Sequence, residues 1–153
     1  MHQRSVLTRA DRGTHTAPMH DAPGLRSICI DCAHPASLAR FWAVALGWTL
    51  RPYDDDDLAL LESQGLTPET DASVCVDPSD PTLPTLWCLQ VPEPKVGKVR
   101  IHLDVNVADA SGFERLIELG ATIVEPHPGG RVWTIMADPE GNEFCAFILE
   151  QAG

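Results

Sequence analysis

Positive charge is scarce in this sequence. The 153 residues contain 11 lysines and arginines against 22 aspartates and glutamates, giving a formal net charge of −11. Only Lys95 and Lys98 are lysines. A surface of this sign repels the phosphates of nucleic acids and the headgroups of anionic membranes. We therefore expect neither nucleic acid nor a membrane as a partner.

Long apolar runs are also missing. No stretch approaches the roughly 20 residues needed to span a bilayer, and residues 1–24 lack the apolar segment of a secretory signal. A cytoplasmic location is the resulting expectation. We predict that residues 1–24 form a disordered leader or an expression remnant outside the folded domain. The five cysteines, an odd number without an export signal, indicate reduced and mostly buried thiols.

Several catalytic and metal-binding motifs are absent as well. The sequence has no phosphate-binding loop, no G-x-S-x-G and no Cys/His nucleophile pattern, so covalent catalysis has no support. Cys29 and Cys32 form a C-x-x-C, but on a strand they point to opposite faces and cannot hold one ion. The acidic run 54–57 lacks the glycine and distal glutamate of an EF-hand, which predicts a solvated turn.

A repeated phrase is the main positive feature. Ile-Cys-Ile-Asp-Cys at 28–32 returns as Ile-His-Leu-Asp-Val at 101–105, and each copy predicts the start of a strand followed by a helical spacing of apolar residues. Both copies are therefore predicted to be βαβββ units. The later strands are predicted at 58–61, 73–76 and 85–91 in the first unit and at 122–125, 131–137 and 143–149 in the second.

Local signals mark the ends of both predicted helices. Pro35 suits a first helical turn, and Ser111 with Glu114 has the spacing of a capping box. Gly47 and Gly120 stand where a left-handed glycine ends a helix.

A tight turn precedes the last predicted strand. The segment 138–142, Asp-Pro-Glu-Gly-Asn, has a proline that suits a type I turn and an aspartate that can accept backbone hydrogen bonds. Its glycine can take the left-handed conformation. The following run places Glu143, Cys145 and Phe147 on one face. We predict a β-hairpin that ends the domain.

Together these features resemble the vicinal oxygen chelate superfamily, which contains glyoxalase I, extradiol dioxygenases, fosfomycin-resistance enzymes and bleomycin-binding proteins. The resemblance rests on the paired units, on Leu46-Gly47, on 102–105 and on the turn 138–142. The segments 41–42, 92–95 and 142–145 are similar to a glyoxalase-like branch.

The resemblance implies an α+β fold. Two tandem βαβββ units, at about 25–91 and 99–150, would form one glyoxalase-like domain spanning 25–150. Their strands would form a cupped mixed sheet with helices outside and a small-molecule pocket inside. A homodimer is also implied.

In metal-dependent members, the first and last strands of both units bind one divalent cation. In the second unit, these positions hold His102 and Cys145, and Cys145 stands three residues after Asn142, where the family has a carboxylate. In the first unit, they hold Ser27 or Cys29 and Gln90 or Cys88. Glu143 lies two residues before Cys145 on the same face. This set is not standard for zinc, nickel, iron or manganese, so we expect no metal cofactor. A zinc site of His102, Cys145 and Cys88 or Cys29 is the alternative.

Two aspartates occupy matching positions in the repeat. Asp31 and Asp104 are expected on the concave side, where neighbouring carboxylates can raise one pKa and create a general base. Asp31 and Asp104 are therefore candidate catalytic residues together with His102. The alternative is that each aspartate only accepts hydrogen bonds at the mouth of the sheet. Trp48, Trp87 and Trp133 are expected mostly in the core, although one facing the pocket would stack on a planar ligand. The residues predicted to line the ligand pocket are Ser27, Cys29, Asp31, Gln90, His102, Asp104 and Cys145.

These residues lead to two functional hypotheses. The first is a protein that binds a small organic molecule on the concave sheet, by sequestration and without the usual catalytic metal. The second is a glyoxalase-like lyase or isomerase in which His102 or an aspartate transfers a proton, with or without a divalent metal.

Overall fold

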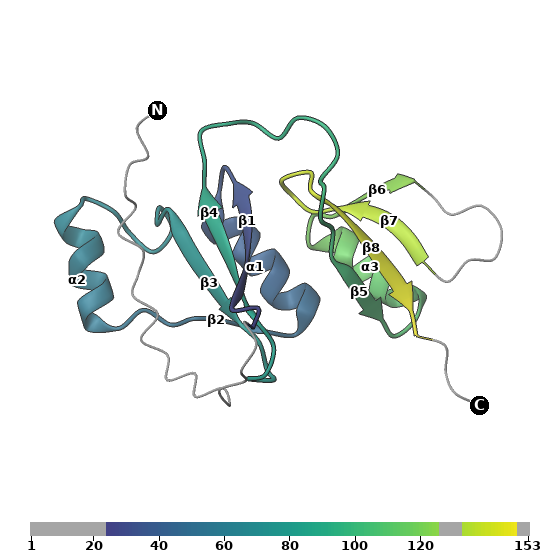
Figure 1. Ribbon diagram of the computed structural model, residues 1–153, viewed down its shortest axis with the longest axis horizontal. Coiled ribbons are helices and arrows are strands. Elements are labelled where there is room, and N and C mark those ends of the chain that lie inside the picture. The colour runs from purple at the N-terminus through teal and green to yellow at the C-terminus, as the bar shows by residue number, and fades with distance from the viewer. Residues whose placement is uncertain (1–23, 126–132, 150–153) are drawn as a thin grey trace. The chain divides into compact units, whose positions relative to one another are not determined.

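The computed structural model describes residues 24–125 and 133–149. The chain forms two compact units that divide between Pro92 and Glu93, and each unit contains one four-stranded mixed sheet. The sheets have the order β1-β4-β3-β2 and β5-β8-β7-β6 (Figure 1). The predicted α+β class is confirmed. None of the helices among the described residues is long and apolar enough to cross a membrane.

The first unit follows the expected order with one addition. Its elements are β1 (Ser27–Cys32), α1 (Pro35–Leu46), β2 (Thr49–Leu50), α2 (Asp55–Ser63), β3 (Ser73–Asp77) and β4 (Thr85–Gln90). Strand β1 pairs in parallel with β4, whereas β3 pairs antiparallel with both β4 and β2.

The second unit repeats this topology without the extra helix. Its elements are β5 (Asp104–Val107), α3 (Ala110–Glu118), β6 (Thr122–Glu125), β7 (Trp133–Ala137) and β8 (Glu143–Ile148). Strand β5 pairs in parallel with β8, as β1 pairs with β4. The predicted part of β7 at 131–132 lies outside the described residues.

Helix α1 packs its apolar side against the first sheet. Its Leu38 is fully buried and its Trp42 is 1% exposed, and Leu86 and Cys88 of β4 are equally buried. Pro35 occupies the first turn, and Gly47 ends the helix with φ of 65°, both as predicted. Packing against α1 therefore defines one face of this sheet as core.

The prediction of a strand at 58–61 is wrong, since these residues lie within α2. Asp54 caps this helix because its side chain accepts from the backbone N–H of Asp57, while the Asp57 side chain accepts from Asp54 N–H. The predicted solvated turn at 54–57 is consequently the cap and first turn of a helix, where acidic side chains are stabilised by the helix dipole. Figure 1 shows α2 standing apart from the sheet of its unit.

Two further predictions about the second unit need correction. Asp109, rather than a Ser111–Glu114 capping box, caps α3 by accepting from the backbone N–H of Ser111 at 2.8 Å. Strand β5 begins at Asp104 instead of Ile101, which is 84% exposed. Inside α3, Gly112 approaches β5 so closely that an added Cβ would lie 2.5 Å from the Cβ of Val107.

The turn at 138–142 is confirmed as the hairpin between β7 and β8. The Asp138 carboxylate accepts from the backbone N–H groups of Glu140 and Asn142, both at 2.9 Å. Gly141 has φ of 83°, the left-handed conformation that glycine adopts without steric cost. This turn sets the register of β8, and with it the position of Cys145.

Candidate functional site

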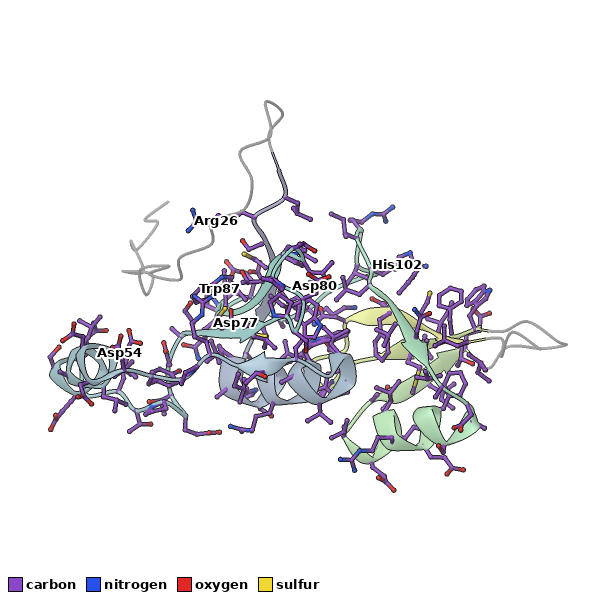
Figure 2. The ribbon with its side chains drawn as sticks, turned by 90° about the horizontal axis from the view of Figure 1, so that it is seen from below. Arg26, Asp54, Asp77, Asp80, Trp87 and His102 are labelled. Atoms are coloured by element: carbon purple, nitrogen blue, oxygen red, sulfur yellow. The ribbon has the colours of Figure 1, made fainter. Side chains whose placement is uncertain are left out.

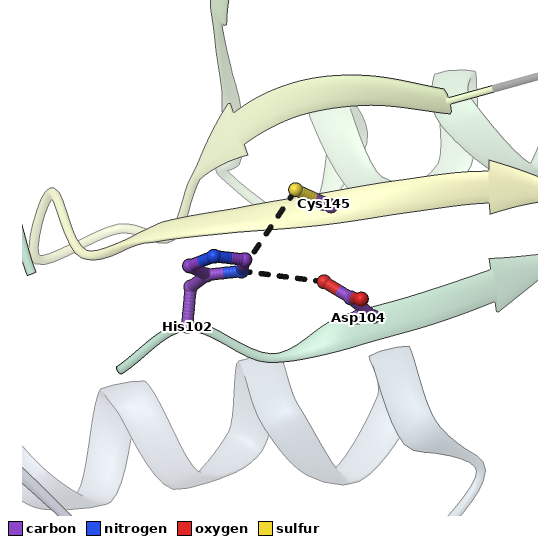
Figure 3. A group of neighbouring side chains, drawn as sticks. All are labelled: His102, Asp104 and Cys145. Atoms are coloured by element: carbon purple, nitrogen blue, oxygen red, sulfur yellow. Dashed lines mark hydrogen bonds and ion pairs between the residues drawn. The ribbon is translucent and has the colours of Figure 1, made fainter. Parts of the chain in front are cut away.

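Three polar side chains form a cluster on the second sheet. His102 lies two residues before Asp104, the first residue of β5, and Cys145 is the partner of Asp104 across the β5–β8 pair. The Nδ1 atom of His102 is 3.3 Å from Oδ1 of Asp104 and 3.9 Å from Sγ of Cys145 (Figure 3). We call His102, Asp104 and Cys145 the polar cluster.

The backbone holds the polar cluster in place. The N–H of Cys145 donates to the carbonyl of Leu103 at 2.9 Å, so pairing with β8 extends beyond the N-terminal end of β5. Val105 and Val107 are buried, whereas Asp104 and Asn106 are exposed, which confirms the predicted alternation. In Figure 2, His102 lies on the side of its sheet away from α3.

The electrostatics of the polar cluster keep its thiol protonated. Burial raises the pKa of the Cys145 thiol above its ordinary value, and the charge and hydrogen bonding of Asp104 raise it further. Asp104 therefore disfavours a free thiolate beside it. A protonated thiol is a weaker nucleophile than a thiolate.

Glu143, the carboxylate nearest the position of Cys145 along β8, is engaged elsewhere. Its carboxylate accepts from the backbone N–H of Val99 at 3.1 Å and pairs with Nζ of Lys95 at 3.1 Å. The hydrogen bond from Val99 is the main reason that the pKa of Glu143 falls to about 2, and Lys95 lowers it further. Glu143 thus ties the segment before β5 to the start of β8.

An aromatic pair lies farther along the same face. Phe147 of β8 pairs with Asn106 of β5 on one side and with Trp133 of β7 on the other. The Trp133 and Phe147 rings lie 6.0 Å apart between centroids at an angle of 33°. Both side chains are only half-buried. Trp48, Trp87 and Trp133 are all half-buried, so the expectation that they lie mostly in the core is wrong.

The first sheet presents the equivalent face. Ser27, Cys29 and Asp31 are the register partners of Thr85, Trp87 and Leu89, and cross-strand partners share a face. Asp31 therefore corresponds to Asp104, and Leu89 to Cys145. Cys29 is exposed and Cys32 is buried, so these two thiols lie on opposite faces, as predicted.

The register separates Gln90 from the other predicted pocket residues of the first unit. Gln90 is the partner of Cys32, which places its side chain on the face that packs against α1. Its amide donates to the carbonyl of Ala33 at 3.2 Å. Cys88 shares that face and is fully buried, so neither residue joins Cys29 or Asp31.

The sequence reasoning missed a charged group on the first sheet. Arg51 makes a two-pronged ion pair with Asp77 at 2.6 and 3.0 Å, and its guanidinium lies 5.4 Å from the centroid of the Trp87 ring. Figure 2 shows Asp77 and Trp87 on the side away from α1. The alternation of β3 and β4 places Asp77 and Trp87 on one face, but it does not predict the approach of Arg51.

One group of side chains on the second sheet has donor atoms of the kind that bind the metal implied by the resemblance. Among the residues that the structure describes, the polar cluster is the group of histidine, cysteine and acidic side chains that could hold an ion, with donor atoms within 4.8 Å of one another. Imidazole, thiolate and carboxylate are all zinc ligands. The predicted alternative zinc set included Cys88 or Cys29, whereas Asp104 is the residue that lies beside His102 and Cys145.

The family of this chain follows from comparison with known proteins. The sequence pattern of the Glyoxalase-like domain family matches residues 27–147. The chain therefore belongs to the Glyoxalase-like domain family. None of the curated proteins matches it.

Solved structures with low sequence identity share the fold. A possible glyoxalase from Bacillus cereus is 15% identical with a TM-score of 0.55, covering 82% of this chain and 99% of its own. The fosfomycin resistance protein FosX from Mesorhizobium loti is 15% identical with a TM-score of 0.54, covering 84% and 94%. A glyoxalase/bleomycin resistance protein/dioxygenase family enzyme from Burkholderia phytofirmans PsJN is 13% identical with a TM-score of 0.54, covering 84% and 100%.

Proposed function

We propose that this protein binds a small organic molecule with a planar ring on the second sheet, on the face away from α3, and sequesters it without a chemical reaction. The observation that carries the proposal is the half-buried pair of Trp133 and Phe147 on the same face as the polar cluster. An apolar surface beside a few polar groups is the usual composition of a ligand site.

The spacing of the two groups limits the size of the ligand. Cys145 and Phe147 are two residues apart on β8, and this repeat spans about 7 Å. A single ring stacked on the aromatic pair therefore places a substituent within reach of the polar cluster. His102 and Asp104 can then donate to or accept from a hydroxyl, amine or carbonyl group on that ring.

Sequestration does not need the usual catalytic metal of the superfamily. In the first unit, Ser27 and Cys29 lie on the face of the sheet away from α1, while Gln90 lies on the face that packs against α1. Cys145 stands where relatives have a carboxylate. The bleomycin-type resistance proteins in the superfamily provide the precedent for binding without a reaction.

A fragment screen of one- and two-ring aromatic compounds, read by protein-observed NMR, tests this proposal. We expect hits to shift the indole signal of Trp133. Trp133→Leu should weaken a hit about three- to tenfold, the effect of losing one stacking interaction. His102→Ala and Asp104→Ala should weaken hits that carry a polar substituent.

The matched control is Trp48→Phe, which changes a half-buried tryptophan of the first unit. It should leave the affinity of every hit unchanged. If Trp48→Phe and Trp133→Leu weaken the hits equally, or if neither does, the site is not on the second sheet.

One observation favours a second function, a lyase or isomerase that transfers a proton. The contact between His102 and Asp104 is the arrangement in which a carboxylate orients a general base. Incubating candidate carbonyl compounds with the protein in deuterated water would reveal C–H exchange. His102→Ala should abolish the exchange, and exchange that survives this change would contradict the role of His102.

The leader predicted at 1–24 falls almost entirely outside the described residues, and the cytoplasmic location stays a prediction. Three expectations about assembly and the pocket also stay predictions. They are the homodimer, which light scattering would test, the joining of Ser27, Cys29 and Asp31 to the same pocket, and a general-base role for the paired aspartates.

A further inference from the structure

Positive charge is concentrated in the segment that leads into β5. Three of the 11 lysines and arginines of the chain lie there, namely Lys95, Lys98 and Arg100. Lys95 pairs with Glu143 at 3.1 Å, so these two residues neutralise each other. Among the residues that the structure describes, neither Lys98 nor Arg100 has an ion-pair partner, and both are exposed. The segment therefore presents uncompensated positive charge on an otherwise acidic chain.

Hydrogen bonds hold Lys98 beside the start of β8. The backbone N–H of Val99, the residue after Lys98, donates to the Glu143 carboxylate at 3.1 Å. Farther along, the carbonyl of Leu103 accepts from the N–H of Cys145 at 2.9 Å. The segment from Val99 to Leu103 consequently follows the first residues of β8, and Lys98 lies at the beginning of this segment.

The charge of Lys98 acts on the polar cluster. Burial and Asp104 raise the pKa of the Cys145 thiol, whereas Lys98 lowers it, as a nearby cation does. Asp104 is the opposing charge at this place, and its side chain is 59% exposed, so water and salt screen its repulsion of a bound anion. Since Lys95 neutralises Glu143, Lys98 and Arg100 together outweigh Asp104. The local charge therefore favours a negatively charged ligand group.

We propose that Lys98 selects ligands whose ring carries a carboxylate, so that the molecule bound on the second sheet is an aromatic acid. This inference rests on the proposed function and names the class of its ligand. The ring stacks on Trp133 and Phe147, and the carboxylate reaches Cys145, where the ammonium group of Lys98 pairs with it. A lysine ammonium is a compact charge on a flexible stem, so it can follow the carboxylate without a fixed geometry.

Phenylacetate and phenylacetamide test this selection, because they share one ring and nearly one shape but differ in charge. The full-length protein is titrated with each compound at low salt, and NMR follows the indole signal of Trp133. We expect phenylacetate to bind about two- to fivefold more tightly than phenylacetamide, the effect of one exposed ion pair. Raising sodium chloride to about 0.5 M should remove most of this preference by screening.

Matched variants identify the cation. Lys98→Gln should remove most of the preference for phenylacetate and leave the affinity for phenylacetamide unchanged, whereas Lys98→Arg should retain the preference. Arg115→Gln is the control, because it removes the same charge from α3, on the other side of the sheet from His102. It should leave both affinities unchanged. Circular dichroism of each variant shows whether it remains folded.

Three results would overturn the role of Lys98 while ring binding stands. These are equal affinities for the two compounds, a preference that survives Lys98→Gln in folded protein, and an equal loss of preference in Arg115→Gln. If neither compound shifts the Trp133 signal, the proposed function fails and this inference fails with it. The two failures are therefore distinguishable.

Discussion

The ion pair of Glu143 yields a prediction about stability and pH. We consider Glu143→Gln, which removes the charge but keeps an oxygen that can accept from Val99. The pKa of Glu143 is lowered from 4.5 to about 2, a difference that corresponds to about 3 kcal/mol at full strength. The Lys95 and Glu143 side chains are 25% and 18% exposed, so solvent screening reduces the expected loss to about 1–2 kcal/mol at pH 7.

The sign of the pH dependence follows from the direction of the shift. Because the folded state lowers this pKa, the stabilisation by Glu143 is fully present above pH 4.5 and is lost as the pH falls toward about 2. The free energies of unfolding of wild type and Glu143→Gln should therefore differ at pH 7 and converge by more than half at about pH 3. Urea unfolding followed by circular dichroism at both pH values measures the difference.

Glu118→Gln is the control for this experiment. Glu118 also forms an ion pair, in this case with Arg115, but the side chains of Arg115 and Glu118 are 62% and 68% exposed. Such a pair contributes less than about 0.5 kcal/mol. If Glu143→Gln costs no more than Glu118→Gln, or costs the same at pH 7 and pH 3, the ionic tether to the segment before β5 does not stabilise the protein.

Further predictions concern backbone and packing, each read by urea unfolding. Gly112→Ala should cost about 1–3 kcal/mol by overpacking, although alanine favours a helix, and Val107→Gly, which removes the Cβ that the new methyl group meets, should reduce that cost; a stabilised Gly112→Ala would refute the close approach. Asp54→Ala should cost about 1 kcal/mol as a lost helix cap and Asp55→Ala much less, so equal effects would argue against capping. Gly141→Ala should destabilise the hairpin by about 1–2 kcal/mol because of its positive φ, and an unchanged stability would contradict this conformation.

Features encoded by neighbouring residues were predictable from the sequence. The turn at 138–142, the glycine at 47 and the alternation of β8 each depend on side chains within a few positions, so their chemistry fixes the local backbone. The position of His102 relative to Asp104 follows in the same way from strand alternation. The approach of Cys145 to both residues needed the β5–β8 register as well.

Two kinds of feature were not predictable, namely the type of a short apolar run and the contacts that depend on distant partners. The apolar run 58–61 is too short to distinguish a strand from a helix, and the cap at Asp54 decides for the helix. Gln90 was assigned by counting along one strand, whereas its face depends on pairing with Cys32 of β1. Its amide donates to the carbonyl of Ala33, which lies 57 residues before it along the chain. The engagement of Glu143 by Val99 likewise spans 44 residues.

The parallel pairing of β5 with β8 has a consequence for the order of folding. His102 and Cys145 are separated by 43 residues, so the chain must close a long loop before their side chains meet. Closing a loop of this length costs about 3 kcal/mol of chain entropy, and parallel pairing across it is slow compared with forming a helix or a hairpin. The hairpin of β7 and β8 can form early from local contacts, but of the three residues of the polar cluster it contains only Cys145. We therefore expect the polar cluster to be completed late in folding, so that its formation would indicate a second unit that has reached its native state.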